Sequence, residues 1–249
     1  MPQHSKRYVV DAAMKCKYIF DVDGTLTPSR EKIDETFRGW FSDFCDRNAV
    51  HLVTGSDYSK TREQLGEALI LRPVSVYTCS GNEMWARGER IRSRVWQLPD
   101  ELRSTLLGWA EASGFKRKTG CHIEDRQGAV NFSVVGRNAD RSERAAYIEW
   151  DTQTDERGRM ARRINSLHPD LHASVGGETG IDIYPRGHDK SQILADFSVA
   201  DTLYFFGDRM DTTGNDYPLS SRLKEPSKSF HVTDWRHTFE TLKELGERL

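Results

Sequence analysis

Two aspartates lie two residues apart at the end of a short apolar run, in the segment Phe20-Asp-Val-Asp-Gly-Thr-Leu-Thr27. Residues i and i+2 of an extended chain project to the same side, so Asp21 and Asp23 can share one site. Two carboxylates in different environments can divide the work, one as an ionised nucleophile or metal ligand and the other as a protonated general acid. An isolated Asp-Gly pair is typical of a solvated turn, but this whole string at the end of a predicted buried strand favours catalysis.

Three further segments carry hydroxyl, ammonium and carboxylate groups at the ends of predicted elements. Hydroxyls can donate hydrogen bonds to a phosphoryl group, an ammonium can lie against its charge, and carboxylates can bind magnesium. Thr54 and Ser56 supply hydroxyls after a second predicted strand, Lys190 opens a predicted helix, and Asp208 and Asp216 follow a late strand. Each group alone is typical of a helix cap, a solvated amine or a turn. Their order, each at a predicted strand end or helix start, favours one composite site.

The elements that must position these residues follow from the periodicity of the sequence. Short β-branched and aromatic runs predict strands, and apolar stripes at helical spacing predict the helices between them. The expected strands span 17–22, 50–54, 74–79 and 202–206, and the expected helices span 31–47, 58–68, 189–197 and a C-terminal stretch from Trp235. The βαβαβ order predicts an α/β fold with a doubly wound, parallel sheet. Such sheets bind ligands at the carboxyl ends of their strands, where Asp21 is expected.

The pattern changes in the middle of the chain. Here we expect a helix near 99–112, alternating strands near 122–135, helices between 141 and 166, and strands near 171–184. An inserted α+β cap explains the change. The sequence therefore predicts a catalytic core at 1–84 and 187–249 and a cap, or substrate-binding domain, at 85–186.

The composition excludes several classes of partner. Lys and Arg number 36 and Asp and Glu 38, and a net charge of −2 gives no global field to attract nucleic acid or an anionic membrane. The four cysteines show neither CxxC nor zinc-finger spacing, and the segment from Met1 to Tyr8 lacks the apolar stretch of a signal peptide. The basic stretch Arg157–Arg163 is more typical of a solvated helix face than of a nucleic-acid site. We expect a cytoplasmic protein with no nucleic-acid or membrane partner.

The segment with Asp21 and Asp23 resembles the first motif, DxDGT, of the haloacid-dehalogenase-like (HAD) phosphotransferase superfamily. The resemblance implies that Asp21 is the nucleophile that becomes phosphorylated and that Asp23 is the general acid/base. Thr54 or Ser56 would then contact the phosphate. Lys190 looks like the lysine of the third motif and would clamp the charge.

The stretch Phe205–Asp216 resembles the fourth motif of the same superfamily, in which Asp208 and Asp216 would be metal carboxylates. The resemblance implies a Mg²⁺ ion bound by Asp21, Asp208 and the backbone carbonyl of Asp23. A catalytically silent binding protein is the alternative from another class. A broken nucleophile would favour it, whereas here every motif carries its reactive residue.

Several stretches resemble the eukaryotic-type phosphomannomutases, a HAD subgroup with an α+β cap between the second and third motifs. The matching stretches are 20–30, which closes with Arg30, then 55–66, 126–137, 142–144, 176–177, 182–185 and 187–190. The resemblance extends from about Phe20 to the C-terminus. It implies a HAD-like core with an inserted cap, and a homodimer formed through the caps.

The same resemblance implies a set of substrate-binding residues. They are Arg30, Thr54 and Ser56 in the core, and Arg126, Asn131, Arg137, Arg144, Gly180 and Asp182 in the cap. A hexose bisphosphate with one phosphate at the magnesium site needs a second anchor, and guanidinium forks bind phosphate oxygens bidentately. A mutase must accept either phosphate at that anchor, whereas a phosphatase has no such need.

We therefore expect a phosphohexomutase, with phosphomannomutase as the best match, that works through a phospho-aspartyl enzyme and a hexose 1,6-bisphosphate. The bisphosphate is a candidate activator. A Mg²⁺-dependent sugar-phosphate phosphatase with the same cap is the alternative. The departures from the family pattern bear on mannose preference, and they are Gly180 in place of Ser, Ser80-Gly-Asn-Glu83 in place of Glu-Asn-Gly, and Met210, Thr213 and Pro218 in the fourth motif.

Overall fold

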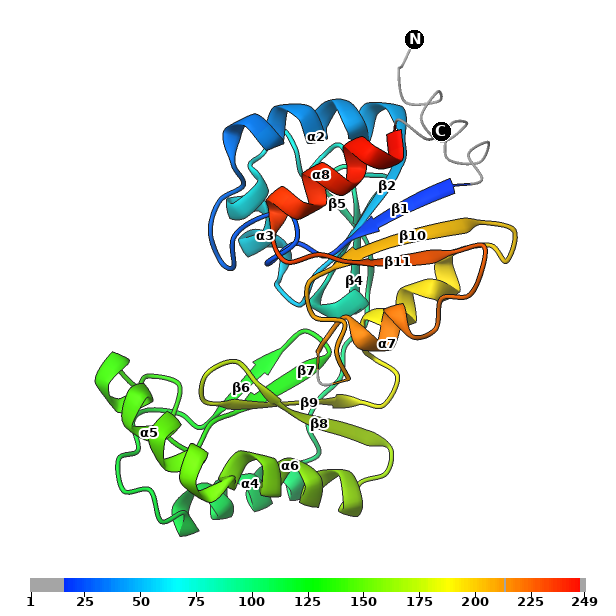
Figure 1. Cartoon of the computed structure of the whole chain (residues 1–249). Coiled ribbons are helices and arrows are strands. Elements are labelled where there is room, and N and C mark those ends of the chain that lie inside the picture. Colours follow the sequence, from blue (N-terminus) through cyan, green and yellow to red (C-terminus); the bar gives the residue numbers. More distant parts are fainter. Residues whose placement is uncertain (1–15, 213, 247–249) are drawn as a thin grey trace. The chain divides into compact units, whose positions relative to one another are not determined.

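The computed structural model describes residues 16–212 and 214–246, which form two compact units (Figure 1). We call the chain up to Ser93 together with the chain from Asp189 the core unit, and Arg94–His188 the inserted unit. The polar N-terminal segment and Thr213, both discussed above, lie outside the described residues. Within the described ranges, no helix is long and apolar enough to cross a membrane.

The core unit is built on a seven-stranded sheet in the order β11-β10-β1-β2-β3-β4-β5. Its strands are β1 (Cys16–Phe20), β2 (Ala49–Val53), β3 (Ser75–Thr78), β4 (Glu83–Ala86), β5 (Glu89–Ser93), β10 (Thr202–Gly207) and β11 (Lys228–His231). The first five in sheet order run parallel, and β4 pairs antiparallel with both of its neighbours, β3 and β5. Because β2 and β3 lie on one side of β1 and β10 and β11 on the other, the direction of winding reverses beside β1. The predicted α/β, doubly wound fold is confirmed.

Alternate residues of the central strands pack on opposite faces of this sheet. Phe20 joins a cluster with Phe41 of helix α2 (Glu35–Arg47), and its ring stacks on that of Phe206 at a centroid distance of 4.7 Å. Ile19, its neighbour in β1, joins the other cluster, with Phe205 and Ile193. Strands buried on both faces read as continuous apolar runs, which is why the sequence predicted them well.

The core helices differ slightly from their predicted spans. Helix α2 begins at Glu35 rather than 31 because the side chain of Asp34 caps it, accepting hydrogen bonds from two backbone N–H groups. Helix α3 (Tyr58–Leu65) ends before 68 because Gly66 takes a left-handed φ of 84°. The predicted helix at 189–197 forms as the 3₁₀ helix η2 (Lys190–Asp196). The predicted C-terminal helix is α8 (Trp235–Gly246), and a short helix, α7 (Tyr217–Ser220), was not predicted.

The inserted unit has an antiparallel four-stranded sheet in the order β6-β7-β9-β8, with helices packed on one face (Figure 1). Its elements are α4 (Asp100–Ala112), β6 (Ile123–Arg126), β7 (Ala129–Phe132), α5 (Arg141–Thr154), α6 (Glu156–Leu167), β8 (Leu171–Gly176) and β9 (Gly180–Pro185). Phe132 and Ile183 face the helices and join a core with Tyr147. The strand partners Asn131 and Asp182 point to the opposite, polar face.

The hairpin β4–β5 belongs to the core unit, although the predicted cap began at 85. It is held there because β4 pairs with β3, with Trp85 opposite Val76 and Met84 opposite Tyr77. Along the chain, the inserted unit therefore runs from Arg94 to His188 instead of from 85 to 186. Assignment of catalysis to the core unit and substrate binding to the inserted unit stays a prediction.

Candidate active site

The carboxyl ends of β1 and β10 bring two predicted site residues together. The strands are parallel neighbours with Phe20 opposite Phe206, and the N–H of Asp21 extends their ladder by donating to the carbonyl of Phe206 at 2.9 Å. Asp21 follows β1 and Asp208 follows β10. Because the winding reverses here, the two side chains lie at a topological switch point, where open α/β sheets bind ligands.

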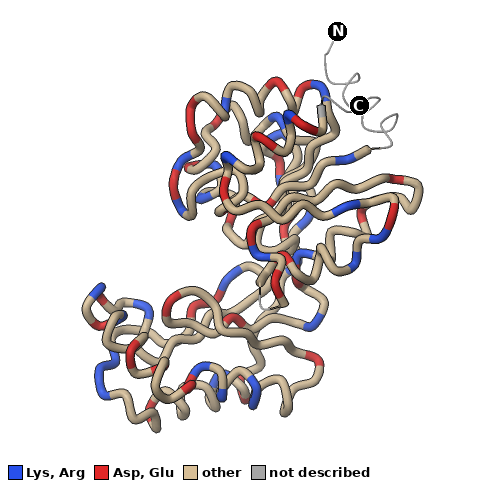
Figure 2. The backbone as a smooth tube through the Cα atoms, viewed as in Figure 1, with Lys and Arg blue, Asp and Glu red and all other residues tan. Residues whose placement is uncertain are grey.

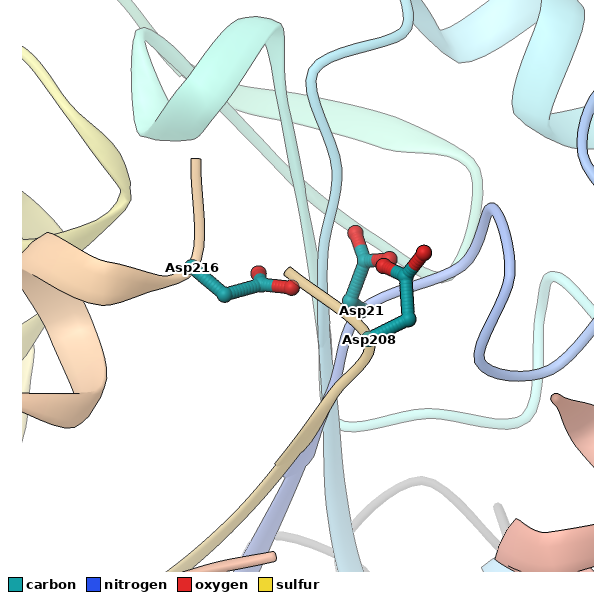
Figure 3. A group of neighbouring side chains, drawn as sticks. All are labelled: Asp21, Asp208 and Asp216. Carbon is teal, nitrogen blue, oxygen red and sulfur yellow. The ribbon is translucent and has the colours of Figure 1, made fainter. Parts of the chain in front are cut away.

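Three carboxylates gather at this edge. One oxygen from each of Asp21, Asp208 and Asp216 lies within 4.8 Å of the others. Figure 3 shows the carboxylates of Asp21 and Asp208 side by side, with that of Asp216 directed toward them. Asp21 and Asp216 are buried, and Asp208 is partly exposed. The structure thus brings together the predicted nucleophile and both predicted metal carboxylates.

The ammonium group of Lys190 binds two of these carboxylates. It donates to Oδ1 of Asp21 and, at 2.7 Å, to Oδ1 of Asp216. Lys190 is itself only 1 % exposed, so neither partner is screened by water. Three ionised carboxylates and one ammonium would leave a charge of −2 in a buried place, which is costly without a further cation.

The pKa values reflect this imbalance. Burial raises the pKa of Asp21 despite the opposing effect of Lys190, and the charge of Asp216 raises it further. Burial and the charge of Asp216 also raise the pKa of Asp208. Burial alone would lower the pKa of Lys190, but Asp21 and Asp216 outweigh that effect and raise it. The lysine therefore stays a cation, while the three carboxylates have too little positive charge around them to balance their own.

The donor set suits a hard divalent cation. All three groups offer carboxylate oxygens, the ligands that Mg²⁺ and Ca²⁺ prefer. Two glycines allow the close approach: a Cβ at Gly24 would overlap the Asp208 carboxylate, and one at Gly207 would lie 2.6 Å from Oδ2 of Asp216. The geometry and the missing positive charge both fit a metal at this cluster.

Asp23 belongs to a separate hydrogen-bond network. Its Oδ1 accepts the backbone N–H of Arg30 at 2.7 Å and the amide of Gln64 at 2.9 Å. Its Oδ2 accepts the hydroxyl of Ser56 at 3.3 Å. Two predicted residues, Asp23 and Ser56, are thus in contact, whereas Arg30 reaches Asp23 through its backbone.

Thr54 and Ser56 differ in what their hydroxyls can do. The Thr54 side chain is buried, and its Oγ1 accepts the N–H of Ser56 at 3.1 Å. The Ser56 hydroxyl is half-buried and lies against Asp23. Of the two phosphate contacts that the sequence left open, Ser56 is the better placed, and Thr54 supports its loop.

The predicted cap residues form a charged cluster on the polar face of the inserted sheet. Asn131 donates to Oδ1 of Asp182 at 2.6 Å and accepts from Arg137 at 2.9 Å. Arg126 also reaches Oδ1 of Asp182, at 3.3 Å, and both arginines bind the carboxylate of Glu124. Glu124 was not predicted.

Arg144 and Gly180 complete the predicted set. Arg144 lies 3.7 Å from Glu178 and donates to the carbonyl of Ala139 at 3.1 Å. A Cβ at Gly180 would overlap the amide of Asn131, so the glycine leaves room for that side chain. Each cap arginine thus has a carboxylate partner, and an incoming phosphate would have to replace it.

Sequence reasoning missed two core residues at the site. The hydroxyl of Thr25 lies 3.3 Å from Oδ2 of Asp21, and its place in the DxDGT string could have indicated this contact. Gln64 is a buried residue in the last turn of α3, and no local motif marks it.

The model of the family described as eukaryotic phosphomannomutase matches residues 37–247. The chain belongs to this family. Among curated relatives, phosphomannomutase 1 of Mus musculus is 32% identical over 213 residues, covering 81% of each chain. The phosphomannomutase of Schizosaccharomyces pombe is 32% identical over 245 residues and covers 93% of this chain and 94% of its own. The part of this chain that the S. pombe alignment leaves out is shorter than the segment that precedes Asp21. The alignment with the S. pombe protein therefore includes the first motif.

Two solved structures illustrate the similarity of the fold. The C-terminal domain of trehalose-6-phosphate phosphatase from C. albicans has a TM-score of 0.62 at 15% identity, with 99% of this chain and 97% of that chain covered. An N-terminally truncated, IMP-bound IMP-nucleotidase from Plasmodium falciparum has a TM-score of 0.61 at 14% identity, covering 96% of this chain and 69% of that chain. At such identities the likeness shows the fold alone.

Replacing Lys190 by Met should destabilise the protein strongly in chelator, because the buried carboxylates of Asp21 and Asp216 would lose their only ammonium partner among the described residues. Removing one partner of a buried ion pair typically costs about 3–5 kcal/mol. Since the pKa values of Asp21 and Asp208 are raised, their ionisation opposes folding at neutral pH. The loss of stability in Lys190→Met should therefore shrink as the pH falls toward the pKa of an ordinary aspartate. Urea unfolding at several pH values measures this.

The exposed Lys228 provides the control, because Lys228→Met removes the same charge from the surface. A Lys190→Met deficit no larger than that of Lys228→Met, or one independent of pH, would show that the ammonium does not balance the carboxylates.

Proposed function

We propose that this protein is a phosphomannomutase, which interconverts hexose 1-phosphate and hexose 6-phosphate through a phospho-aspartyl enzyme and a hexose 1,6-bisphosphate. One observation carries the proposal: Asp21 lies at the end of a buried strand with one oxygen on Lys190, while Asp23, two residues on, lies in a separate network. This separation suits one carboxylate for attack and the other for proton transfer. The family to which the chain belongs supports the choice of reaction.

The core residues divide the chemistry as follows. A carboxylate oxygen of Asp21 attacks phosphorus, and the bond from phosphorus to the sugar oxygen breaks as the new bond forms. Asp23 gives a proton to the departing sugar oxygen, and it later takes one from the hydroxyl that attacks the phospho-aspartate. Lys190 holds Asp21 in place and balances the charge of the transferring group, and Ser56 is the hydroxyl best placed to contact the phosphate.

Mg²⁺ is the cation that we propose for the acidic cluster. Asp21, Asp208, Asp216 and the backbone carbonyl of Asp23 would hold it. When bound, it supplies positive charge against the phosphoryl oxygens. The oxygen-only donor set and the excess of negative charge support this choice.

The arginine cluster of the inserted unit is the proposed anchor for the phosphate that is not reacting. Arg126, Arg137 and Arg144 offer guanidinium groups, and Asn131 and Asp182 offer partners for sugar hydroxyls. Either phosphate of a hexose bisphosphate can bind such an anchor, as a mutase requires. A trace of hexose 1,6-bisphosphate should therefore act as an activator by phosphorylating Asp21.

Two further expectations belong to the same proposal. Family resemblance favours a homodimer formed through the inserted units, acting on a small sugar phosphate. The absence of a strong net field supports a protein that binds neither nucleic acid nor membranes: Figure 2 shows both signs of charge interspersed over each unit. A cytoplasmic location fits that reading.

Asp21→Asn should reduce turnover to background, because the amide has no anionic oxygen for attack. The variant should fold, and in chelator it should be at least as stable as the wild type, since it removes one charge from a cluster with excess negative charge. Wild-type activity should disappear in chelator and return with Mg²⁺. Steady-state assays and thermal unfolding measure both effects, with the exposed Asp43→Asn as control. Substantial turnover by Asp21→Asn would exclude the covalent route.

Arg137→Ala should separate a mutase from a phosphatase. Loss of a bidentate, charge-assisted phosphate contact should cost roughly 1.5–3 kcal/mol, or about one to two decades in conversion of hexose 1-phosphate to hexose 6-phosphate. Hydrolysis of a small aryl phosphate should fall much less, because that substrate has no second phosphate. Coupled assays of both reactions measure the difference.

The exposed Arg141 lies at the start of α5 and gives a matched control, Arg141→Ala, which should leave both rates near wild type. If the wild type releases only inorganic phosphate from every hexose phosphate, with or without bisphosphate, the sugar-phosphate phosphatase alternative replaces the mutase.

A further inference from the structure

The two carboxylate oxygens of Asp23 have different surroundings. Oδ1 accepts two N–H groups, from the Arg30 backbone at 2.7 Å and from Nε2 of Gln64 at 2.9 Å. Oδ2 is bound, among the described residues, only by the Ser56 hydroxyl at the longer distance of 3.3 Å. A carboxylate oxygen has two lone-pair positions, so Oδ1 is fully used and Oδ2 has one to spare.

Gln64 fixes this arrangement from the buried face of α3. It is 4 % exposed, and its Nε2 also lies 3.3 Å from the hydroxyl of Thr27. Its backbone carbonyl accepts the N–H of Ile33 at 2.9 Å. One residue thus holds the loop after β1 at three places, and the carboxylate of Asp23 is the only charged group among them.

The orientation of the Gln64 amide is set by that charge. Turning the amide over would place its oxygen against the Asp23 carboxylate, where two acceptors would repel each other. In the observed orientation, Oε1 is buried and has no hydrogen-bond partner within 16–212 and 214–246. A buried acceptor without a partner is costly, and an apolar side chain of the same length would avoid the cost. The N–H bond to Asp23 is what distinguishes glutamine from such a side chain.

The backbone of Arg30 makes the second contribution. Its φ of 63° lies in the left-handed region, which is uncommon for a residue with a side chain. This turn brings its N–H onto Oδ1 of Asp23 across a loop of seven residues. Two independent elements, the loop after β1 and helix α3, therefore hold the same oxygen.

We propose that Gln64 is a positioning residue that makes Oδ2 the proton-transferring oxygen of Asp23. The inference rests on the proposed acid/base role of Asp23. The proton leaves Oδ2 for the departing oxygen as its bond to phosphorus breaks and the bond from Asp21 to phosphorus forms. On the return step, Oδ2 takes the proton of the attacking hydroxyl as the bond from Asp21 to phosphorus breaks. Oδ1 stays bound to its two N–H donors throughout.

The test is the dependence of the rate on the leaving group. A phenol of low pKa departs without a proton, whereas a phenol of high pKa needs one from Asp23. Rapid-quench measurement of phenol release during phosphorylation of Asp21 should be made with phenyl, 4-nitrophenyl and 2,4-dinitrophenyl phosphate. Gln64→Met keeps the side-chain length and removes the donor. It should slow the phenyl ester roughly tenfold or more and the dinitrophenyl ester less than about threefold, which steepens the dependence.

Thr61→Val is the matched control, because Thr61 is buried on the same helix and loses one hydrogen bond, from its hydroxyl to the carbonyl of Asp57. It should leave the leaving-group dependence of the wild type unchanged. If Gln64→Met fails to fold, Gln64→Leu also removes the amide donor without adding a charge and carries the same expectation.

The outcomes separate this inference from the proposed function. An unchanged rate with Gln64→Met, or an equal loss with all three esters, would overturn the positioning role alone. A steeper dependence in Thr61→Val as well would also overturn it, because the effect would then come from the helix and not from the amide. Absence of phenol release from every ester by the wild type would overturn the proposed function and this inference together.

Discussion

Lys190 lies buried between Asp21 and Asp216, and the rest of the core site depends on this contact. Charges interact strongly where water is excluded, and an unpaired buried carboxylate is expensive. The ammonium allows a carboxylate nucleophile to be kept at the end of a buried strand with Asp208 beside it. One ammonium does not balance three carboxylates, so the same contact leaves the site in need of a divalent cation. Affinity for metal and preparation of the nucleophile thus have one electrostatic cause.

This constraint explains how the chain is laid out. Asp21 comes from the first strand of the sheet, while Lys190 follows directly after the inserted unit and begins η2. The chain must leave the core after β5 and return at Asp189 to supply the ammonium. Glycine at 24 and 207 then lets the carboxylates approach one another. Asp23 is kept apart from this cluster by its own donors, so the two aspartates of one motif can have different roles.

Much of this arrangement was predictable from the sequence, because buried parallel strands are continuous apolar runs and their ends carry the reactive residues. The place of the hairpin β4–β5 was not predictable, since β4 is partly exposed and β5 mostly exposed. Pairing of β4 with β3, and not the pattern of the hairpin itself, fixes its place. Gln64 was missed because a glutamine inside a helix carries no local signal, and only tertiary contact brings it to Asp23. The carboxylate partners of the cap arginines, such as Glu124, were missed for the same reason.

The account depends most directly on Asp21 becoming phosphorylated. The decisive measurement is to mix wild-type protein and Mg²⁺ with ³²P-labelled hexose 1,6-bisphosphate, stop the reaction within milliseconds, reduce the acyl phosphate with borohydride and locate the modified aspartate by mass spectrometry. The account predicts one modified position, Asp21, and in a parallel chase the label should pass from the protein to added hexose 1-phosphate. Label on another residue, or turnover without any labelled protein, would contradict it.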